Sequence, residues 1–115
     1  MYATKFLLAA VSSTLLFCHA LAKTGDATYF FPGLGACGLQ NGNQDLIVAL
    51  NPADYAGGAN CGRSIVVNYQ GKSVITKVVD LCPGCGAGGV DLSPAAFQQL
   101  ASLDLGRIQV NWNFV

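Results

Sequence analysis

Two aspartates on either side of a glycine-rich loop are the residues of this chain best placed to do chemistry. Asp80 ends the apolar run 74–79, and Asp91 follows the loop. A carboxylate at the end of a buried strand can have a shifted pKa and can mark a functional site. Asp91 is not needed to cap a helix, because Ser93 and Pro94 already supply an N-cap and a first-turn proline. Asp91 is therefore the stronger candidate for a functional carboxyl.

Other catalytic groups are missing from the sequence. There is no glutamate, and the one histidine, His19, lies in the N-terminal leader. Serine–histidine or cysteine–histidine catalysis and histidine-ligated metal chemistry therefore lack their residues. The sequence predicts no metal and no cofactor.

The first 22 residues have the pattern of a secretory signal peptide. Lys5 gives a positive start, residues 6–17 are mostly apolar, and Ala20-Leu21-Ala22 fits a cleavage site. The apolar stretch is too short to span a bilayer, which takes about 20 residues. We therefore expect a secreted, extracellular protein whose mature part, residues 23–115, is a single domain without a membrane segment.

Four cysteines remain after removal of the leader, namely Cys37, Cys61, Cys82 and Cys85. An even number in an oxidising compartment predicts two disulfides, with three possible pairings. We favour Cys37 with Cys61 and Cys82 with Cys85. A zinc ribbon would use two C-x-x-C pairs, and a redox pair would begin a helix, which the glycines after Cys85 disfavour.

The charge balance excludes several partners. Of the six Lys and Arg residues, Lys5 lies in the leader, which leaves five against six Asp and no basic run. Nucleic acid and anionic membranes are poor partners for such a surface. A monomer is expected.

The secondary structure is predicted to be mainly β. Strands are expected over residues 25–31, 46–50, 63–70, 72–80 and 107–114, and helices from Pro52, capped by Asn51, and over 94–103. Trp112 shares the apolar face of the last strand, so it is predicted to lie in the core rather than to serve as a platform for sugars.

Several short motifs carry a resemblance that covers essentially the whole mature chain. They are GDATY at 25–29, GACG at 35–38, ALNPAD at 49–54, VDLCP at 79–83 and VDLSPAAF at 90–97. In order and spacing they resemble the barrel domain of expansins, above all the single-domain fungal expansin-like proteins called loosenins. The chain is also similar to barwin-like and RlpA-like proteins. The resemblance implies a six-stranded double-psi β-barrel with one or two short helices, linked by disulfides.

The resemblance also implies a groove that binds cell-wall polysaccharide such as cellulose, chitin or a related glucan. Thr28 and Tyr29 match the threonine and aromatic of the first strand, and Asp80 and Asp91 match the two aspartates of the expansin groove. Asp91 further matches the general acid of family 45 endoglucanases. Without the resemblance, Thr28 and Tyr29 fit an ordinary strand.

One departure bears on catalysis. An inverting glycosidase needs a second carboxylate as base, and in family 45 it belongs just after the tyrosine of the first strand. Here residues 30–32 are Phe-Phe-Pro, and the next carboxylate is Asp45. We therefore expect no enzyme: neither family 45 hydrolysis nor lytic transglycosylase activity.

Two functions follow as hypotheses. The first is a secreted, expansin-like protein that binds and loosens polysaccharide without hydrolysis. The alternative is a protein-binding module, such as a cysteine-protease inhibitor or a plant-interaction effector of the barwin-like type. A lack of aromatic side chains that stack on sugars would favour the alternative, and Tyr29, Phe30 and Tyr55 leave both hypotheses open.

Overall fold

The computed structural model describes residues 22–115, so the predicted signal peptide, except Ala22, lies outside the described residues. The strands are β1 (Lys23–Tyr29), β2 (Ile47–Leu50), β3 (Ser64–Tyr69), β4 (Lys72–Leu81), β5 (Val90–Leu92) and β6 (Ile108–Phe114). The helices are α2 (Pro52–Tyr55) and α3 (Pro94–Gln98), with 3₁₀ turns η3 (Ala56–Gly58) and η4 (Leu103–Leu105). None of the helices in this part of the chain is long and apolar enough to cross a membrane.

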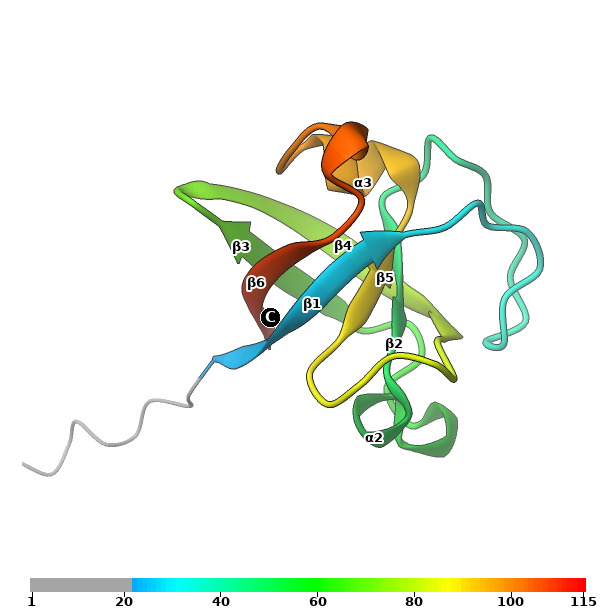
Figure 1. Ribbon diagram of the computed structural model, residues 1–115. Coiled ribbons are helices and arrows are strands. Elements are labelled where there is room, and N and C mark those ends of the chain that lie inside the picture. Colours follow the sequence, from blue (N-terminus) through cyan, green and yellow to red (C-terminus); the bar gives the residue numbers. More distant parts are fainter. Residues whose placement is uncertain (1–21) are drawn as a thin grey trace, which may run out of the picture.

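The six strands form a closed barrel, as the family resemblance implied, and their order in it is β1-β5-β2-β4-β3-β6 (Figure 1). The pairs β1–β5 and β2–β4 are parallel, and the other four pairs are antiparallel. Closure leaves no strand edge unpaired within the barrel. Helix α3 lies at one end of the barrel and α2 at the other, while a long loop between β1 and β2 extends to one side.

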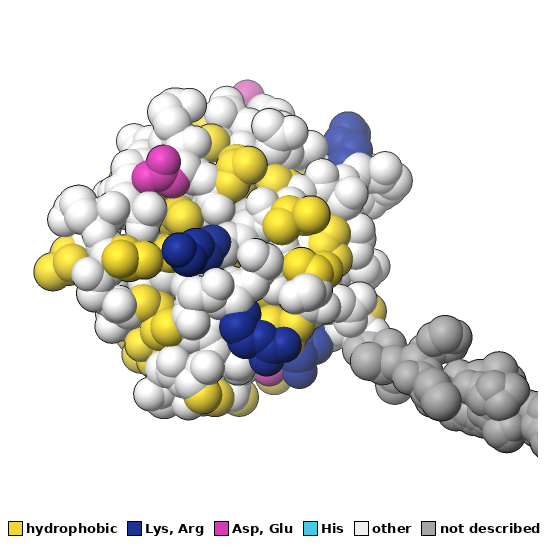
Figure 2. All heavy atoms as spheres, turned by 180° about the vertical axis from the view of Figure 1, so that it is seen from behind, with side chains coloured by type: hydrophobic (Ala, Val, Ile, Leu, Met, Phe, Trp, Pro, Cys, Tyr) yellow, Lys and Arg dark blue, Asp and Glu magenta, His cyan; other side chains and the backbone are white. Residues whose placement is uncertain are grey.

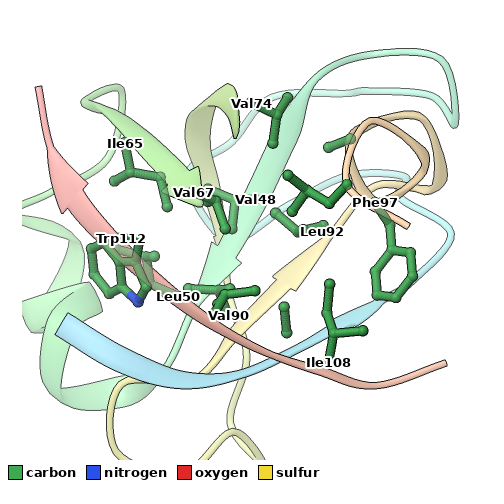
Figure 3. Close-up of a cluster of buried hydrophobic side chains, with 14 of the residues drawn as sticks. Val48, Leu50, Ile65, Val67, Val74, Val90, Leu92, Phe97, Ile108 and Trp112 are labelled. Carbon is green, nitrogen blue, oxygen red and sulfur yellow. The ribbon is translucent and has the colours of Figure 1, made fainter. Parts of the chain in front are cut away.

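The core fills the inside of the barrel with side chains that alternate along each strand (Figure 3). Trp112 lies toward one end and Phe97, from α3, toward the other, and both are fully buried. The predicted core position of Trp112 is therefore confirmed. Its indole N–H is satisfied too, because Nε1 donates a 2.9 Å hydrogen bond to the carbonyl of Gly88.

The predicted disulfides are both present. Cys37 is bonded to Cys61, which ties the long β1–β2 loop to the segment after η3, and Cys82 is bonded to Cys85. The first closes a much longer stretch of chain than the second, 24 residues apart against 3. On the loop-entropy account the two are worth roughly 3 and 2 kcal/mol.

The predicted caps are confirmed, but some boundaries were wrong. Asn51 and Ser93 each accept a hydrogen bond from a backbone N–H in the first turn of the helix that follows. The helix predicted over 94–103 ends at Gln98, because Ser102 adopts an extended conformation and caps the separate turn η4. Strand β5 was not predicted at all.

The glycine-rich loop between β4 and β5 rests directly on β1. A Cβ atom placed on Gly25 would lie 2.4 Å from the carbonyl carbon of Gly88, a distance that real Cβ atoms do not reach. Gly88 itself has a φ of 72°, which favours glycine. This contact between two backbones sets the position of the loop.

One buried polar atom has no hydrogen-bond partner on the inner face of β4. Thr76 is 1% exposed, and its hydroxyl oxygen is unpartnered among the described residues. An unsatisfied buried hydroxyl costs about 1–3 kcal/mol.

Replacing this hydroxyl by a methyl group should stabilise the fold. We predict that Thr76→Val raises the free energy of unfolding by about 1 kcal/mol, because the shape is kept and the unpaired group is removed. Urea denaturation of the mature protein measures the difference. Thr24→Val, the same change at an exposed position of β1, is the control and should stay within about 0.5 kcal/mol of the wild type. A destabilised Thr76→Val protein would show that the hydroxyl is satisfied after all.

Candidate functional site

The direction of Asp91 follows from its two neighbours. Val90 and Leu92 are fully buried in the core, and successive side chains of a strand point to opposite faces. Asp91, between them, must point out of the barrel, and it is half-buried there. A three-residue strand thus presents one carboxyl on the outer surface.

Asp91 belongs to a row of four residues that crosses four neighbouring strands. Thr28 of β1 pairs with Asp91 of β5, Asp91 pairs with Ala49 of β2, and Ala49 pairs with Asp80 of β4. Residues paired in this way project from the same face of a sheet. We call these residues, Thr28, Asp91, Ala49 and Asp80, the aspartate row. Adjacent strands are about 4.8 Å apart, so the backbones at the two aspartates are separated by about 10 Å.

A β-bulge in β4 brings Asp80 into the row. Val48 pairs with Val78, but Ala49 pairs with Asp80, so Val79 is an extra residue on β4. A bulge of one residue reverses the direction of every side chain that follows. Without the bulge, regular alternation from the buried Val78 would point Asp80 into the apolar core.

Asp80 also holds the β1–β2 loop against the barrel. Its Oδ1 atom accepts 2.8 Å hydrogen bonds from the backbone N–H groups of Ala36 and Leu81. The N–H of Cys37 donates to the carbonyl of Val79 at 3.1 Å. One oxygen of Asp80 is therefore committed to backbone amides, and the carboxylate has a structural role in addition to its place in the row.

Asp91 has a different environment. The hydroxyl of Thr28 donates a 2.8 Å hydrogen bond to its Oδ1 atom, and Oδ2 has no hydrogen-bond partner in the described part of the chain. Partial burial raises the pKa of the Asp91 carboxyl above its ordinary value. The hydrogen bond from Thr28 and the positive charge of Arg107 act in the opposite direction, and the negative charge of Asp80 adds to the increase in pKa.

A cavity of about 340 Å³ adjoins the row at Thr28. Asp26 and Arg107 line one side of it, and the loop closed by the Cys82–Cys85 disulfide lines another. Arg107 donates from an Nη atom to Asp26 Oδ2 at 2.8 Å, and Gln109 donates to the other oxygen. Sequence analysis missed Asp26 and Arg107, since they are 81 residues apart and no local pattern relates them.

Tyr29 lies on the opposite side of β1 from Thr28. It pairs with the buried Leu92, and its ring packs edge-on against Phe97 at a centroid distance of 5.1 Å and against Phe31 at 6.2 Å. The structure thus brings together Thr28, Asp80 and Asp91 of the predicted site residues but not Tyr29. A role for Tyr29 in binding stays a prediction.

The β1–β2 loop differs from the aspartate row because it exposes large apolar side chains. Four of its large apolar side chains are exposed, from 42% to 74%, namely Phe31, Leu34, Leu39 and Leu46. Figure 2, which shows the back of the molecule, has hydrophobic side chains scattered over this face, with Lys or Arg side chains next to some of them. We call these four residues the apolar loop.

Residues 22–115 contain no group of three or more His, Cys, Asp or Glu side chains that could hold a metal ion. The aspartate row itself offers hydroxyl and carboxyl groups, and the positive charge of Arg107 acts on Asp91.

Known proteins resemble this chain in sequence and in fold. It is 39% identical over 103 residues to the papain inhibitor of Streptomyces mobaraensis, which covers 80% of this chain and 71% of that protein. It is 36% identical over 109 residues to an EG45-like domain containing protein of Citrus jambhiri, which covers 82% of each.

Among solved structures, an aspartate-to-asparagine mutant of Clavibacter michiganensis expansin, in complex with cellohexaose, superposes with a TM-score of 0.77 at 28% identity. The match covers 83% of this chain and 50% of the expansin. The family described as Lytic transglycolase, whose domain is the RlpA-like double-psi β-barrel, matches residues 22–112. Together with the closed six-stranded barrel, this match shows that the chain belongs to the double-psi β-barrel family.

Proposed function

We propose that this protein is secreted, binds cell-wall polysaccharide along the aspartate row and loosens it without hydrolysis. The observation that carries the proposal is the Thr28–Asp91 pair, a hydroxyl and a half-buried carboxyl that face outward side by side. The similarity to an expansin solved in complex with cellohexaose supports binding of a polysaccharide.

The row offers hydrogen bonds of the kind that sugar hydroxyls accept and donate. Asp91 Oδ2 is free to accept from a hydroxyl, and a hydrogen bond to a charged group is worth about 1.5–3 kcal/mol. Ala49, between the aspartates, is only 2% exposed, so the partly exposed carboxyls are what this part of the row offers to a ligand. A chain of hydroxyl-bearing rings is a suitable ligand for such a line of acceptors.

Hydrolysis is a poorer fit to the two carboxyls. Asp91, with its raised pKa, could serve as an acid, but an inverting mechanism also needs a carboxylate that activates water. Asp80 is the nearest candidate in the row, and two backbone amides engage one of its oxygens. The segment after β1, where a base would be expected by resemblance, has no carboxyl.

Secretion is supported by the predicted signal peptide and by the two disulfides, which persist in oxidising compartments. These features are consistent with a protein that acts outside the cell.

A second candidate function is inhibition of a cysteine protease. The similarity to a papain inhibitor covers most of that protein, and the apolar loop exposes the kind of side chains that protein partners bury. This surface is separate in composition from the aspartate row, so the two candidates can be tested with different variants.

A binding assay with Asp91→Asn tests the first candidate. We predict that the wild type sediments with insoluble cellulose or chitin but releases no reducing sugar, and that Asp91→Asn binds about tenfold more weakly through loss of a charged acceptor. Asp104→Asn is the matched control, because it removes an exposed carboxylate from η4.

Three results would contradict the first candidate. Sustained release of reducing sugar would show an enzyme. If Asp91→Asn bound polysaccharide as tightly as the control Asp104→Asn, the polysaccharide would not bind at the aspartate row. Inhibition of papain, lost in Leu34→Ser and accompanied by no binding to polysaccharide, would favour the second candidate.

The raised pKa of Asp91 predicts how stability depends on pH. Between the ordinary pKa of aspartate, about 3.9, and the higher folded value, the native state holds more protons than the unfolded state. Stability due to this group is therefore present at acidic pH and is lost as the pH rises through the folded pKa. Asparagine resembles the neutral carboxyl and does not ionise.

We therefore predict that Asp91→Asn is more stable than the wild type at pH 7 and that the difference vanishes below about pH 4. Urea denaturation of both proteins across this range measures it, with Asp104→Asn as the control for a general change in charge. A less stable Asp91→Asn protein at pH 7 would mean that the ionised carboxylate stabilises the fold.

A further inference from the structure

The Cys82–Cys85 disulfide closes a short turn on the outside of the barrel. Only Pro83 and Gly84 separate the two cysteines, and both cysteines are partly exposed. Both also line the cavity of about 340 Å³ beside Thr28. A small molecule that enters this cavity therefore lies next to the disulfide.

The contacts within this turn are local. The N–H of Cys85 donates to the carbonyl of Cys82 at 3.2 Å, and the N–H of Gly89 donates to the carbonyl of Gly86 at 2.8 Å. A Cβ atom added at Gly84 or Gly86 would meet nothing within 4 Å. The disulfide is therefore the main restraint on the position of Cys85 relative to Cys82.

The two ends of the turn are fixed by contacts that do not involve sulfur. At the start, the N–H of Cys82 donates to the carbonyl of Leu50 at 2.8 Å. At the end, the carbonyl of Gly88 accepts a 2.9 Å hydrogen bond from the indole of Trp112. Cleavage of the disulfide therefore frees residues 83–87 and leaves the core of the barrel in place.

The Cys37–Cys61 disulfide is held in a different way. The N–H of Cys37 donates to the carbonyl of Val79 at 3.1 Å, and the N–H of Gly62, next to Cys61, donates to the carbonyl of Val78 at 2.8 Å. Two adjacent residues of β4 thus keep the two cysteines close together even when their bond is cut. Thiols that are held close together re-form their disulfide readily, so this bond resists reduction.

We propose that the Cys82–Cys85 pair is a site of thiol–disulfide exchange, at which a low-molecular-weight thiol reduces the pair from the cavity while Cys37–Cys61 and the barrel stay intact. The thiolate of the small molecule attacks one sulfur of the pair, the S–S bond breaks, and the other cysteine leaves as a thiolate that takes up a proton. A second thiol attacks the mixed disulfide. Two small thiols are thereby oxidised to one disulfide, and the pair is reduced to two thiols.

The direction of this exchange follows from the local structure. The element after Cys85 is β5 and not a helix whose N-terminus would lower the pKa of a thiol. The pair therefore accepts electrons from a small thiol and is not built to attack the disulfides of other proteins. This inference does not depend on the binding of polysaccharide.

Equilibration of the mature protein with mixtures of reduced and oxidised glutathione tests the proposal. After rapid alkylation, mass spectrometry of peptides measures the fraction of free thiol at each cysteine. Cys82 and Cys85 should be half reduced at a ratio of [GSH]² to [GSSG] about a hundredfold lower than Cys37 and Cys61, since hydrogen bonds to β4 keep the latter two together. Amide chemical shifts of the selectively reduced protein should change in the segment 82–88 and stay as in the oxidised protein elsewhere.

The approach through the cavity is tested by the rate of reduction. Ala87 is an exposed residue of the cavity wall, so Ala87→Leu should narrow the access to the pair and slow its reduction by glutathione about threefold. Ala53→Leu, the same change at an exposed position of α2, is the control and should keep the wild-type rate. A double variant, Cys82→Ser with Cys85→Ser, should keep the barrel folded.

Any of three results would overturn the proposal. Reduction of Cys37–Cys61 at the same ratio or a lower one would show that the turn is not the more reducible site. Unfolding of the barrel on reduction of Cys82–Cys85 alone, or in the double variant, would make this disulfide a structural bond. An Ala87→Leu protein that is reduced as fast as Ala53→Leu would place the approach of the thiol outside the cavity.

Discussion

The burial of Val90 and Leu92 is the constraint on which the site depends. Strand β5 has only three residues, yet it lies between β1 and β2 and completes the barrel through parallel pairing on one side and antiparallel pairing on the other. Both apolar residues are needed in the core, so Asp91 has one direction left. The same pairing places Thr28 beside it, and the hydrogen bond between them follows from the register.

The two aspartates of the row perform different tasks although they project from the same face. Asp80 reaches this face through the bulge at Val79 and then fastens the β1–β2 loop through Ala36. Asp91 is tied only to Thr28, so more of its capacity is open to a ligand. Substitution of Asp80 therefore combines an effect on folding with any effect on binding, whereas Asp91 reports on binding more cleanly.

Local patterns were sufficient to predict much of this fold. The hairpin of β3 and β4, the alternation of β6 and the caps Asn51 and Ser93 each depend on a few neighbouring residues. The resemblance of the short motifs to expansins predicted the barrel, and it identified Thr28, Asp80 and Asp91 as candidate site residues.

Other features depend on contacts between distant segments, which local patterns cannot reveal. Val-Asp-Leu is too short to show a strand period, and β5 is stable only between its two neighbours. The bulge at Val79 is defined by the pairing of β4 with β2, which are distant in the sequence. Tyr29 was predicted to share a binding site with Thr28. Consecutive residues of a strand face opposite sides, however, and the ring of Tyr29 packs against that of Phe97.

The central claim is that polysaccharide binds at the aspartate row and not at the apolar loop. These surfaces involve different residues, so amide chemical shifts recorded while a soluble oligosaccharide is added can distinguish them. Chitohexaose and cellohexaose should each shift the amides of Thr28, Ala49 and Asp91 most strongly and leave those of Leu34 and Leu39 unchanged. Largest shifts in the segment 31–46, or none anywhere at millimolar oligosaccharide, would contradict the account.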